Sequence, residues 1–133
     1  MQSIEIASSL DRIAEVESMI DSVCEELSLN EDSYGNVLIA VTEAVNNAIV
    51  HGNHSLPEKR VVVSVEQNEK KVVFTVHDEG EGFDFENLPD PTAPENLEKL
   101  NGRGIFLMKS LSDGVEFDES GSKVSITFAM NNG

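Results

Sequence analysis

This chain has few of the residues that cross-link a protein, anchor it in a membrane or bind polyanions. One cysteine, Cys24, in 133 residues can form neither an internal disulfide nor a multi-cysteine metal site, which favours a reducing, cytoplasmic location. No apolar run approaches the roughly 18–20 residues that a membrane span needs. Residues 1–17 lack the basic start and long apolar centre of a signal peptide. We therefore expect a cytoplasmic protein with no membrane partner.

Basic residues are scarce as well, with 9 Lys and Arg against 25 Asp and Glu and a formal net charge of -16. Binding to a nucleic-acid backbone needs a basic surface, so we expect no direct nucleic-acid partner. A basic protein partner is compatible with this charge. So is a purely solubilising role for the acidic residues.

What the chain does contain is a series of amphipathic segments over a length that suits one domain, residues 1–133. Helical spacing of apolar residues predicts helices over residues 8–29, with Ser9 as the cap, and 30–54. The order β-α-α-β-β-loop-α-β-β predicts an α+β fold, a two-layer sandwich of one mixed, mostly antiparallel sheet with helices on one face. The expected strands are residues 3–7, 61–68, 71–78, 114–120 and 123–130.

The first candidate motif lies on the second predicted helix, in the run EAVNNA. Glu43 and Asn47 are four residues apart and share a helix face, and His51 continues the same row. A carboxylate and an amide beside an apolar stripe can solvate a cation and orient a hydroxyl group. The same pair is also compatible with a polar helix face in water.

The second motif is DEGEGFD, which follows the strand predicted over residues 71–78. Asp78, Gly80 and Gly82 form a D-x-G-x-G pattern, in which glycines let the backbone approach a ligand closely. A carboxylate at a strand end can accept a hydrogen bond from an exocyclic amine, or bind a metal. The spacing of acidic residues does not match an EF-hand calcium loop. An ordinary glycine-rich turn is the other interpretation.

The third motif is NGRGIFLMKSL, at the end of a long irregular stretch over residues 79–104, which includes one short predicted helix near PENLEKL. Gly102 and Gly104 precede an apolar helix predicted over residues 104–113. Free amide groups at a helix start can bind phosphate, and the Arg103 guanidinium can pair with phosphate oxygens. A flexible joint with a surface arginine is the alternative.

The order and setting of the three motifs resemble the GHKL ATPase family, which has the Bergerat ATP-binding fold. VTEAVNNAIVHGN, DEGEGFD and GRGIFLMKSLSDGVEF are similar in particular to the anti-sigma-factor serine kinases of bacteria. The resemblance spans nearly the whole chain. It implies ATP and Mg²⁺ as cofactors, and a short ATP lid between the second and third motifs.

The resemblance also implies roles for individual residues. Asn47 matches the asparagine that binds magnesium between the phosphates, and Glu43 matches the general base for the attacking hydroxyl. Asp78 matches the aspartate that accepts from the adenine amine. The glycines that match those near adenine and phosphate are Gly80, Gly82, Gly102 and Gly104.

Two places depart from the family pattern, and one of them is Arg103, which fills the variable middle position of the second glycine box. Many relatives carry G-T-T-V near the last strand, where a threonine helps the adenine aspartate. This chain reads GSKV over residues 121–124, and Ser122 is the residue that could substitute.

By resemblance, the chain is an ATP-dependent protein serine/threonine kinase that phosphorylates a STAS-type anti-anti-sigma partner and sequesters a sigma factor, and it pairs as a homodimer. Two other functions are alternatives. One is a regulatory module that binds ATP or a partner without phosphoryl transfer. The other is a detached histidine-kinase catalytic domain, which the short lid disfavours.

Overall fold

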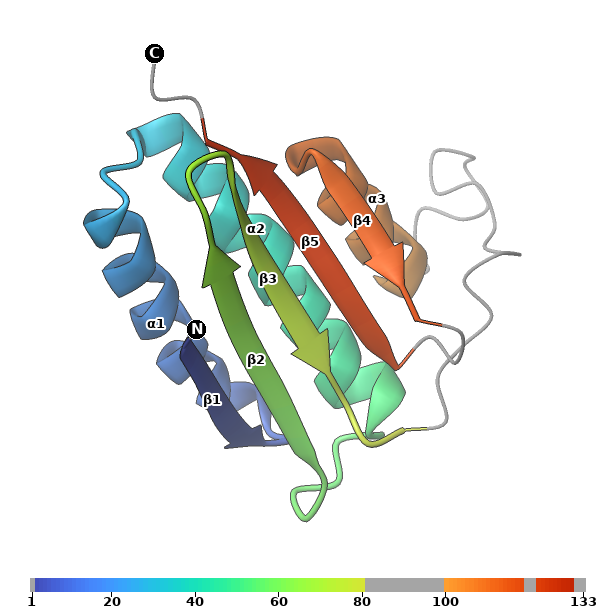
Figure 1. Cartoon of the computed structure of the whole chain (residues 1–133). Helices are drawn as coiled ribbons and strands as arrows, with labels where there is room; N and C mark the ends of the chain where they lie inside the picture. The colour runs from blue at the N-terminus through green and yellow to red at the C-terminus, as the bar shows by residue number, and fades with distance from the viewer. Residues whose placement is uncertain (1, 81–99, 119–121, 131–133) are drawn as a thin grey trace.

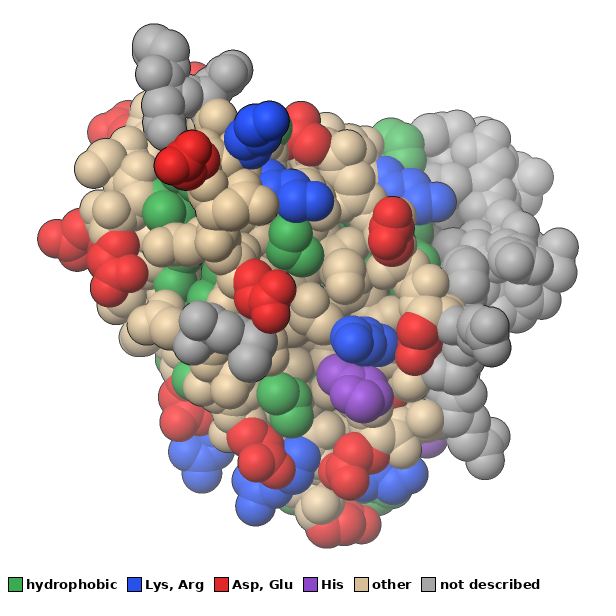
Figure 2. All heavy atoms as spheres, in the orientation of Figure 1, with side chains coloured by type: hydrophobic (Ala, Val, Ile, Leu, Met, Phe, Trp, Pro, Cys, Tyr) green, Lys and Arg blue, Asp and Glu red, His purple; other side chains and the backbone are tan. Residues whose placement is uncertain are grey.

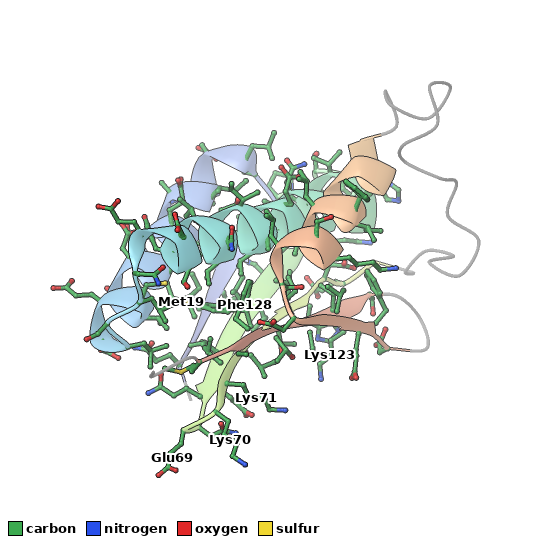
Figure 3. The ribbon with its side chains drawn as sticks, turned by 90° about the horizontal axis from the view of Figure 1, so that it is seen from above. Met19, Glu69, Lys70, Lys71, Lys123 and Phe128 are labelled. Carbon is green, nitrogen blue, oxygen red and sulfur yellow. The ribbon has the colours of Figure 1, made fainter. Side chains whose placement is uncertain are left out.

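The protein folds into two layers, a sheet and a group of helices packed on one of its faces (Figure 1). The structure is a computed structural model, and it describes residues 2–80, 100–118 and 122–130. Seen from above, the described helices lie on the same side of the sheet (Figure 3). This arrangement confirms the α+β sandwich predicted from the sequence.

The sheet of the described residues has five strands in the order β1-β2-β3-β5-β4. Every pairing between them is antiparallel. Strand β5 lies between β3 and β4, and this places the start of β5 beside the end of β3. The strands are β1 (Gln2–Ala7), β2 (Arg60–Gln67), β3 (Lys71–His77), β4 (Gly114–Phe117) and β5 (Lys123–Ala129).

The first two predicted helices begin close to the predicted positions, and they differ in how they are capped. Ser9 precedes a short 3-10 turn and makes no side-chain capping bond; its hydroxyl donates to Asp11 instead. Asn30 caps the next long helix by accepting from the Ser33 amide at 2.8 Å, as capping residues do. The described helical segments are η1 (Leu10–Arg12), α1 (Ile13–Glu26), α2 (Glu31–Asn47), η2 (Ala48–Gly52) and α3 (Leu100–Leu111).

The core lies between the sheet and the helices. Phe74 on β3 and Phe128 on β5 meet edge to face, with ring centroids 6.1 Å apart, a favoured aromatic geometry. Branched aliphatic side chains from α1, α2 and the central strands surround them. The largest fully buried side chains include Ile20, Ile49, Met108, Ile126 and Val45. No helix within the described ranges is long and apolar enough to cross a membrane.

Helix α2 changes its pitch at its C-terminal end. Residues Ala48–Gly52 form a π-helical turn, in which the Asn53 amide donates to the Ala48 carbonyl at 2.8 Å. Such turns are rare and often mark functional sites. The wider turn ends the row predicted from Glu43 and Asn47, so His51 lies exposed in the π turn.

Candidate functional site

The π turn brings Gly52 against the end of β3. A Cβ atom placed on Gly52 would lie 2.8 Å from Asp78 Oδ1 and closer still to Oδ2. A Cβ atom on Gly80 would collide with the Gly52 carbonyl oxygen and lie 2.6 Å from its carbon. Both positions therefore require glycine, and the first and second motifs meet here in space.

Asp78 is buried and held from two sides. Its backbone N–H donates to the Ser122 carbonyl at 2.9 Å, and its carboxylate Oδ1 accepts from the Gly80 amide at 2.8 Å. Burial raises the pKa of Asp78 above its ordinary value, although the Gly80 hydrogen bond and the charge of His77 act in the opposite direction. A perturbed carboxylate in such a place is a candidate for ligand recognition.

Asn53 is a residue that the sequence reasoning missed. Its side chain is fully buried, and its amide nitrogen donates to Ser8 Oγ at 2.8 Å and to the Arg60 carbonyl at 3.1 Å. Its amide oxygen accepts from the Glu79 backbone N–H at 2.8 Å. Asn53 thus fixes the turn after Asp78 to the end of α2. The run HGN after a helix was the available signal, but its burial is a tertiary property.

The other end of the site forms where α3 packs on α2. A Cβ atom on Gly104 would lie 2.8 Å from Asn47 Nδ2 and 3.2 Å from Glu43 Oε2. The absence of a side chain at Gly104 therefore leaves room for the two polar side chains of α2. The structure brings the first and third motifs together at this point.

The Asn47 amide has an unusual environment. Both its oxygen and its nitrogen are buried, and neither has a hydrogen-bond partner among the described residues. Buried polar groups are nearly always paired, so each exception needs an explanation. An amide oxygen is a suitable ligand for a hard cation such as Mg²⁺. The Asn47 amide therefore fits a site that a cation and its ligand would complete.

The protein supplies few other candidate metal ligands there. Within the described part of the chain, no three His, Cys, Asp or Glu side chains are grouped closely enough to hold a metal ion. Mg²⁺ commonly keeps several waters and binds through one or two protein groups plus phosphate oxygens. A single amide beside a phosphate-bearing ligand is compatible with that behaviour.

Helix α3 starts earlier than predicted. It begins at Leu100, so Gly102 and Gly104 lie inside the helix and not before it. Gly102 stays in the first turn, whose N–H groups lack acceptors within the helix, whereas Gly104 is the fifth helical residue. The expectation that both glycines expose free amides is therefore wrong for Gly104, which serves close packing instead. Arg103 lies in the same first turn.

Three further predictions remain to be placed. Gly82 and the short helix predicted near PENLEKL lie outside the described residues, apart from Leu100. Ser122 is buried, and its carbonyl accepts from the Asp78 N–H. That contact joins the Ser122 backbone to the backbone of Asp78, the residue that Ser122 was predicted to help, while the role of the Ser122 hydroxyl stays a prediction.

Known proteins are similar in sequence to this chain over nearly its whole length. The profile of the histidine kinase-like ATPase domain matches residues 6–128, and the chain belongs to that family. It is 31% identical to the anti-sigma F factor of Clostridium beijerinckii, over 97% of this chain and 94% of that protein. It is 28% identical to the serine-protein kinase RsbW of Staphylococcus aureus, over 92% of this chain and 82% of that protein. The resemblance inferred from the three motifs is confirmed.

Two more comparisons agree. The anti-sigma F factor of Bacillus cytotoxicus is 34% identical over 86% of this chain and 77% of that protein. The fold also matches a crystal structure of the RsbU and RsbW domains of a Mycobacterium tuberculosis protein, with a TM-score of 0.60 and 12% identity. The match covers 98% of this chain but only 32% of that one, and at this identity it supports the fold alone.

Proposed function

We propose that this chain is an ATP-dependent anti-sigma protein serine kinase, which phosphorylates a STAS-type anti-anti-sigma partner and sequesters a sigma factor. One observation carries the proposal most directly. The buried Asn47 amide, which has no hydrogen-bond partner in the described part of the chain, lies with the Glu43 carboxylate against Gly104, while the same helix end holds Asp78 through Gly52. Asn47 ends α2 and Gly52 ends η2, so both ends of the site are built on one continuous helical segment.

Each end would bind a different part of ATP. Asp78 would accept a hydrogen bond from the adenine amine, with Gly80 leaving the backbone open to the base. Gly102 and Arg103, in the first turn of α3, would face the phosphates, where amide groups and a guanidinium favour negative charge. The Asp78 carboxylate would then lie at the adenine end and would not contact the phosphates, although the chain as a whole is acidic.

The transfer step would need mainly positioning and charge stabilisation. Glu43 would accept the proton of a serine hydroxyl on the partner. The serine oxygen would form a bond to the γ-phosphorus as the bond from that phosphorus to the β–γ bridging oxygen breaks, and ADP would leave. Magnesium held through the Asn47 amide would supply charge neutralisation at the phosphate oxygens.

The partners follow from the relatives named above, which are anti-sigma F factors and a serine-protein kinase. A sigma factor and a STAS-type anti-anti-sigma protein would therefore be the two protein ligands, in a cytoplasmic setting. The proposal includes pairing of two copies of this chain, as inferred from the family resemblance. The net charge of -16 would favour encounter with a basic surface on a partner.

The direct test uses Glu43→Gln, which keeps the size and polarity of the side chain and removes the base. With ATP, Mg²⁺ and purified STAS-type proteins from the same genome, we expect the unaltered chain to phosphorylate one of them on serine. Glu43→Gln should bind ATP with unchanged affinity. It should transfer phosphate more slowly by a factor of about 100 or more, within the usual range for loss of a general base. Mass spectrometry of the partner and calorimetry of ATP binding give the two readouts.

A second variant separates a kinase from a module that only binds ATP. Asn47→Ala should lose the Mg²⁺ dependence of ATP affinity while the chain stays folded. If the unaltered chain bound ATP with magnesium but phosphorylated no STAS-type protein, the nucleotide site would stand and the kinase assignment would fail. Full-rate transfer by Glu43→Gln would remove Glu43 from the role of base.

A further inference from the structure

Two exposed apolar side chains lie on the outer surface of the helical layer. Ile39 on α2 and Phe106 on α3 are each 44% exposed. Among the described residues, Leu10 and Leu56 are the other large apolar side chains with comparable exposure. A single exposed apolar side chain needs no explanation, whereas several grouped on one surface mark an interaction site. Whether Ile39 and Phe106 belong to one surface depends on how α2 and α3 pack.

Helices α2 and α3 lie side by side and run antiparallel (Figure 3). The start of α3 meets the end of α2, where Gly104 lies against the Glu43 carboxylate. The end of α3 meets the start of α2, where residues 110–113 and Ser33 line one cavity. Because each helix rises about 1.5 Å per residue, Phe106 lies within about one turn of the level of Glu43.

Ile39 and Phe106 both face away from the core. On α3, Ile105 and Met108 are buried, so Phe106 lies on the opposite, outer side of the helix. On α2, Ile39 and Glu43 are four residues apart and share a face, with about 5–6 Å between their Cβ atoms. Packed helix axes are about 8–10 Å apart, which places Phe106 across the α2–α3 contact from this pair. We call the surface formed by Ile39, Glu43 and Phe106 the seam surface.

The seam surface is nearly free of charge in a chain with a net charge of -16. Residues 33–50 include one charged side chain, Glu43, and residues 104–112 include one, Lys109. By contrast, residues 10–26 include six acidic side chains and one basic one. The helix-free face of the sheet, seen in Figure 2, carries interspersed acidic and basic side chains. Few charges together with exposed aromatic and aliphatic side chains are typical of the core of a protein interface.

The position of Glu43 identifies what covers this surface. A Cβ atom on Gly104 would lie 3.2 Å from Glu43 Oε2, so the carboxylate is directed into the contact between α2 and α3. Under the proposed function, the serine hydroxyl of the partner must come within about 3 Å of that carboxylate. The part of the partner around its serine would then cover the exposed side chains nearest to Glu43, which include Ile39 and Phe106.

We propose that Ile39 and Phe106 are the apolar anchors that seat the STAS-type partner for phosphoryl transfer, and that its acceptor serine lies on an uncharged, apolar patch of its surface. This docking mode rests on the proposed function, to which it adds the place and the driving force of partner binding. The force is burial of apolar area. A few such side chains at the centre of an interface commonly carry most of the binding energy.

The first test compares the same kind of truncation inside and outside the seam surface. Phe106→Ala and Ile39→Ala should each weaken binding of the STAS-type partner about tenfold or more, measured by calorimetry with ADP and Mg²⁺. In the kinase assay, KM for the partner should rise by the same factor while kcat and ATP affinity stay unchanged. Leu10→Ala is the matched control, because Leu10 is 52% exposed and lies in η1, away from α2 and α3. It should change none of these quantities.

Two further measurements separate apolar docking from other effects. Ile39→Val keeps most of the apolar area and should bind the partner within about twofold of the unaltered chain. Raising the NaCl concentration tenfold should weaken partner binding by less than about threefold, because salt screens charge pairs and leaves apolar contacts intact. Affinity that falls steeply with salt would assign docking to the acidic residues of α1 and overturn the proposal.

Cross-linking locates the contact directly. Benzoylphenylalanine in place of Phe106 should form an adduct, under ultraviolet light, with the partner peptide that carries the acceptor serine. The same group in place of Leu10 should form none. Mass spectrometry identifies the joined peptides. An adduct on a partner surface far from the acceptor serine would refute the docking mode.

The remaining outcomes distinguish this proposal from the proposed function. Unchanged partner affinity in both alanine variants, or an equal loss in Leu10→Ala, would overturn the seam surface and leave the kinase assignment intact. Partner binding with the expected losses but without serine phosphorylation would support the seam surface and remove the kinase activity. A change in the sedimentation of the Phe106→Ala chain, with unchanged partner affinity, would assign the surface to a second copy of the chain. Absence of binding by every STAS-type protein of the genome would refute both proposals.

Discussion

The two ends of the candidate site are built in opposite ways. Around Asp78 the protein satisfies its own polar groups: the Asp78 carboxylate accepts from Gly80, and Asn53 joins Glu79 to Ser8 and Arg60. Around Asn47 the amide is buried without any partner among the described residues. The first end is complete without a ligand, whereas under the proposed function ATP and Mg²⁺ would complete the second. Substitutions that break the internal contacts of the first end should therefore affect stability and binding together, and those at the second should affect binding alone.

The largest effect is expected for Gly80→Ala at the completed end. The added methyl would overlap the Gly52 carbonyl, so the turn after β3 and the π turn must separate, at a cost of about 3 kcal/mol of unfolding free energy. ATP binding should be lost as well. Urea unfolding and calorimetry measure the two effects. Gly35→Ala is the control, because nothing lies within 4 Å of its added methyl and it should gain up to about 1 kcal/mol from helix propensity.

Asn53→Ala should have the next largest effect. It leaves the Glu79 amide, the Ser8 hydroxyl and the Arg60 carbonyl without the Asn53 side chain as a partner, which costs about 1–3 kcal/mol. Because the Asp78 turn loosens, affinity for adenosine should fall together with affinity for ATP, while the Mg²⁺ dependence of ATP binding persists. Ser8→Ala removes one of these bonds without touching the turn, and it should lower stability with unchanged adenosine affinity. Equal losses of adenosine affinity in both variants would assign Asn53 a purely structural role.

Asp78→Asn should separate stability from binding at the completed end. Since burial raises the pKa of Asp78, the folded state binds its proton more tightly than the unfolded state. The contribution of Asp78 to stability is therefore full below the ordinary carboxyl pKa and is lost as pH rises through the raised pKa. Asp78→Asn should remove this loss and be at least as stable at pH 7.

The same variant should bind ATP about tenfold more weakly or worse, as expected when a hydrogen bond to a charged group is lost. Thermal unfolding between pH 4 and pH 8 and calorimetry with ATP provide the data. A variant that destabilises the fold at pH 7 yet keeps full ATP affinity would contradict both parts of the interpretation.

The smallest effect on stability is expected for Gly104→Ala at the Asn47 end of the site. Alanine favours the helix by about 1 kcal/mol over glycine, which offsets the crowding of a methyl 2.8 Å from Asn47 Nδ2. The unfolding free energy should therefore change by less than about 1 kcal/mol, while Mg²⁺-dependent ATP affinity falls because Asn47 must move. Adenosine affinity should stay unchanged. A parallel loss of adenosine affinity would show that the two ends are not independent.

Much of the fold was predictable because the information is local. The apolar period of α1 and α2, the alternation in β2 and β3, and the asparagine cap at Asn30 are all set by neighbouring residues. The family was predictable from the order of three motifs. The start of α3 was misplaced because glycines at 102 and 104 indicate a helix boundary, and packing against α2 overrode that preference.

The sequence by itself determined the elements, the family and the residue types able to bind a nucleotide, since periodicity and motif order survive without knowledge of contacts. Only the tertiary structure decided that Gly52 and Gly104 must lack side chains and that Asn53 is a buried link. It also decided that the Asn47 amide is buried without a hydrogen-bond partner among the described residues. These properties depend on atoms from segments far apart in the chain, and their distances exist only once the sheet and helices have packed.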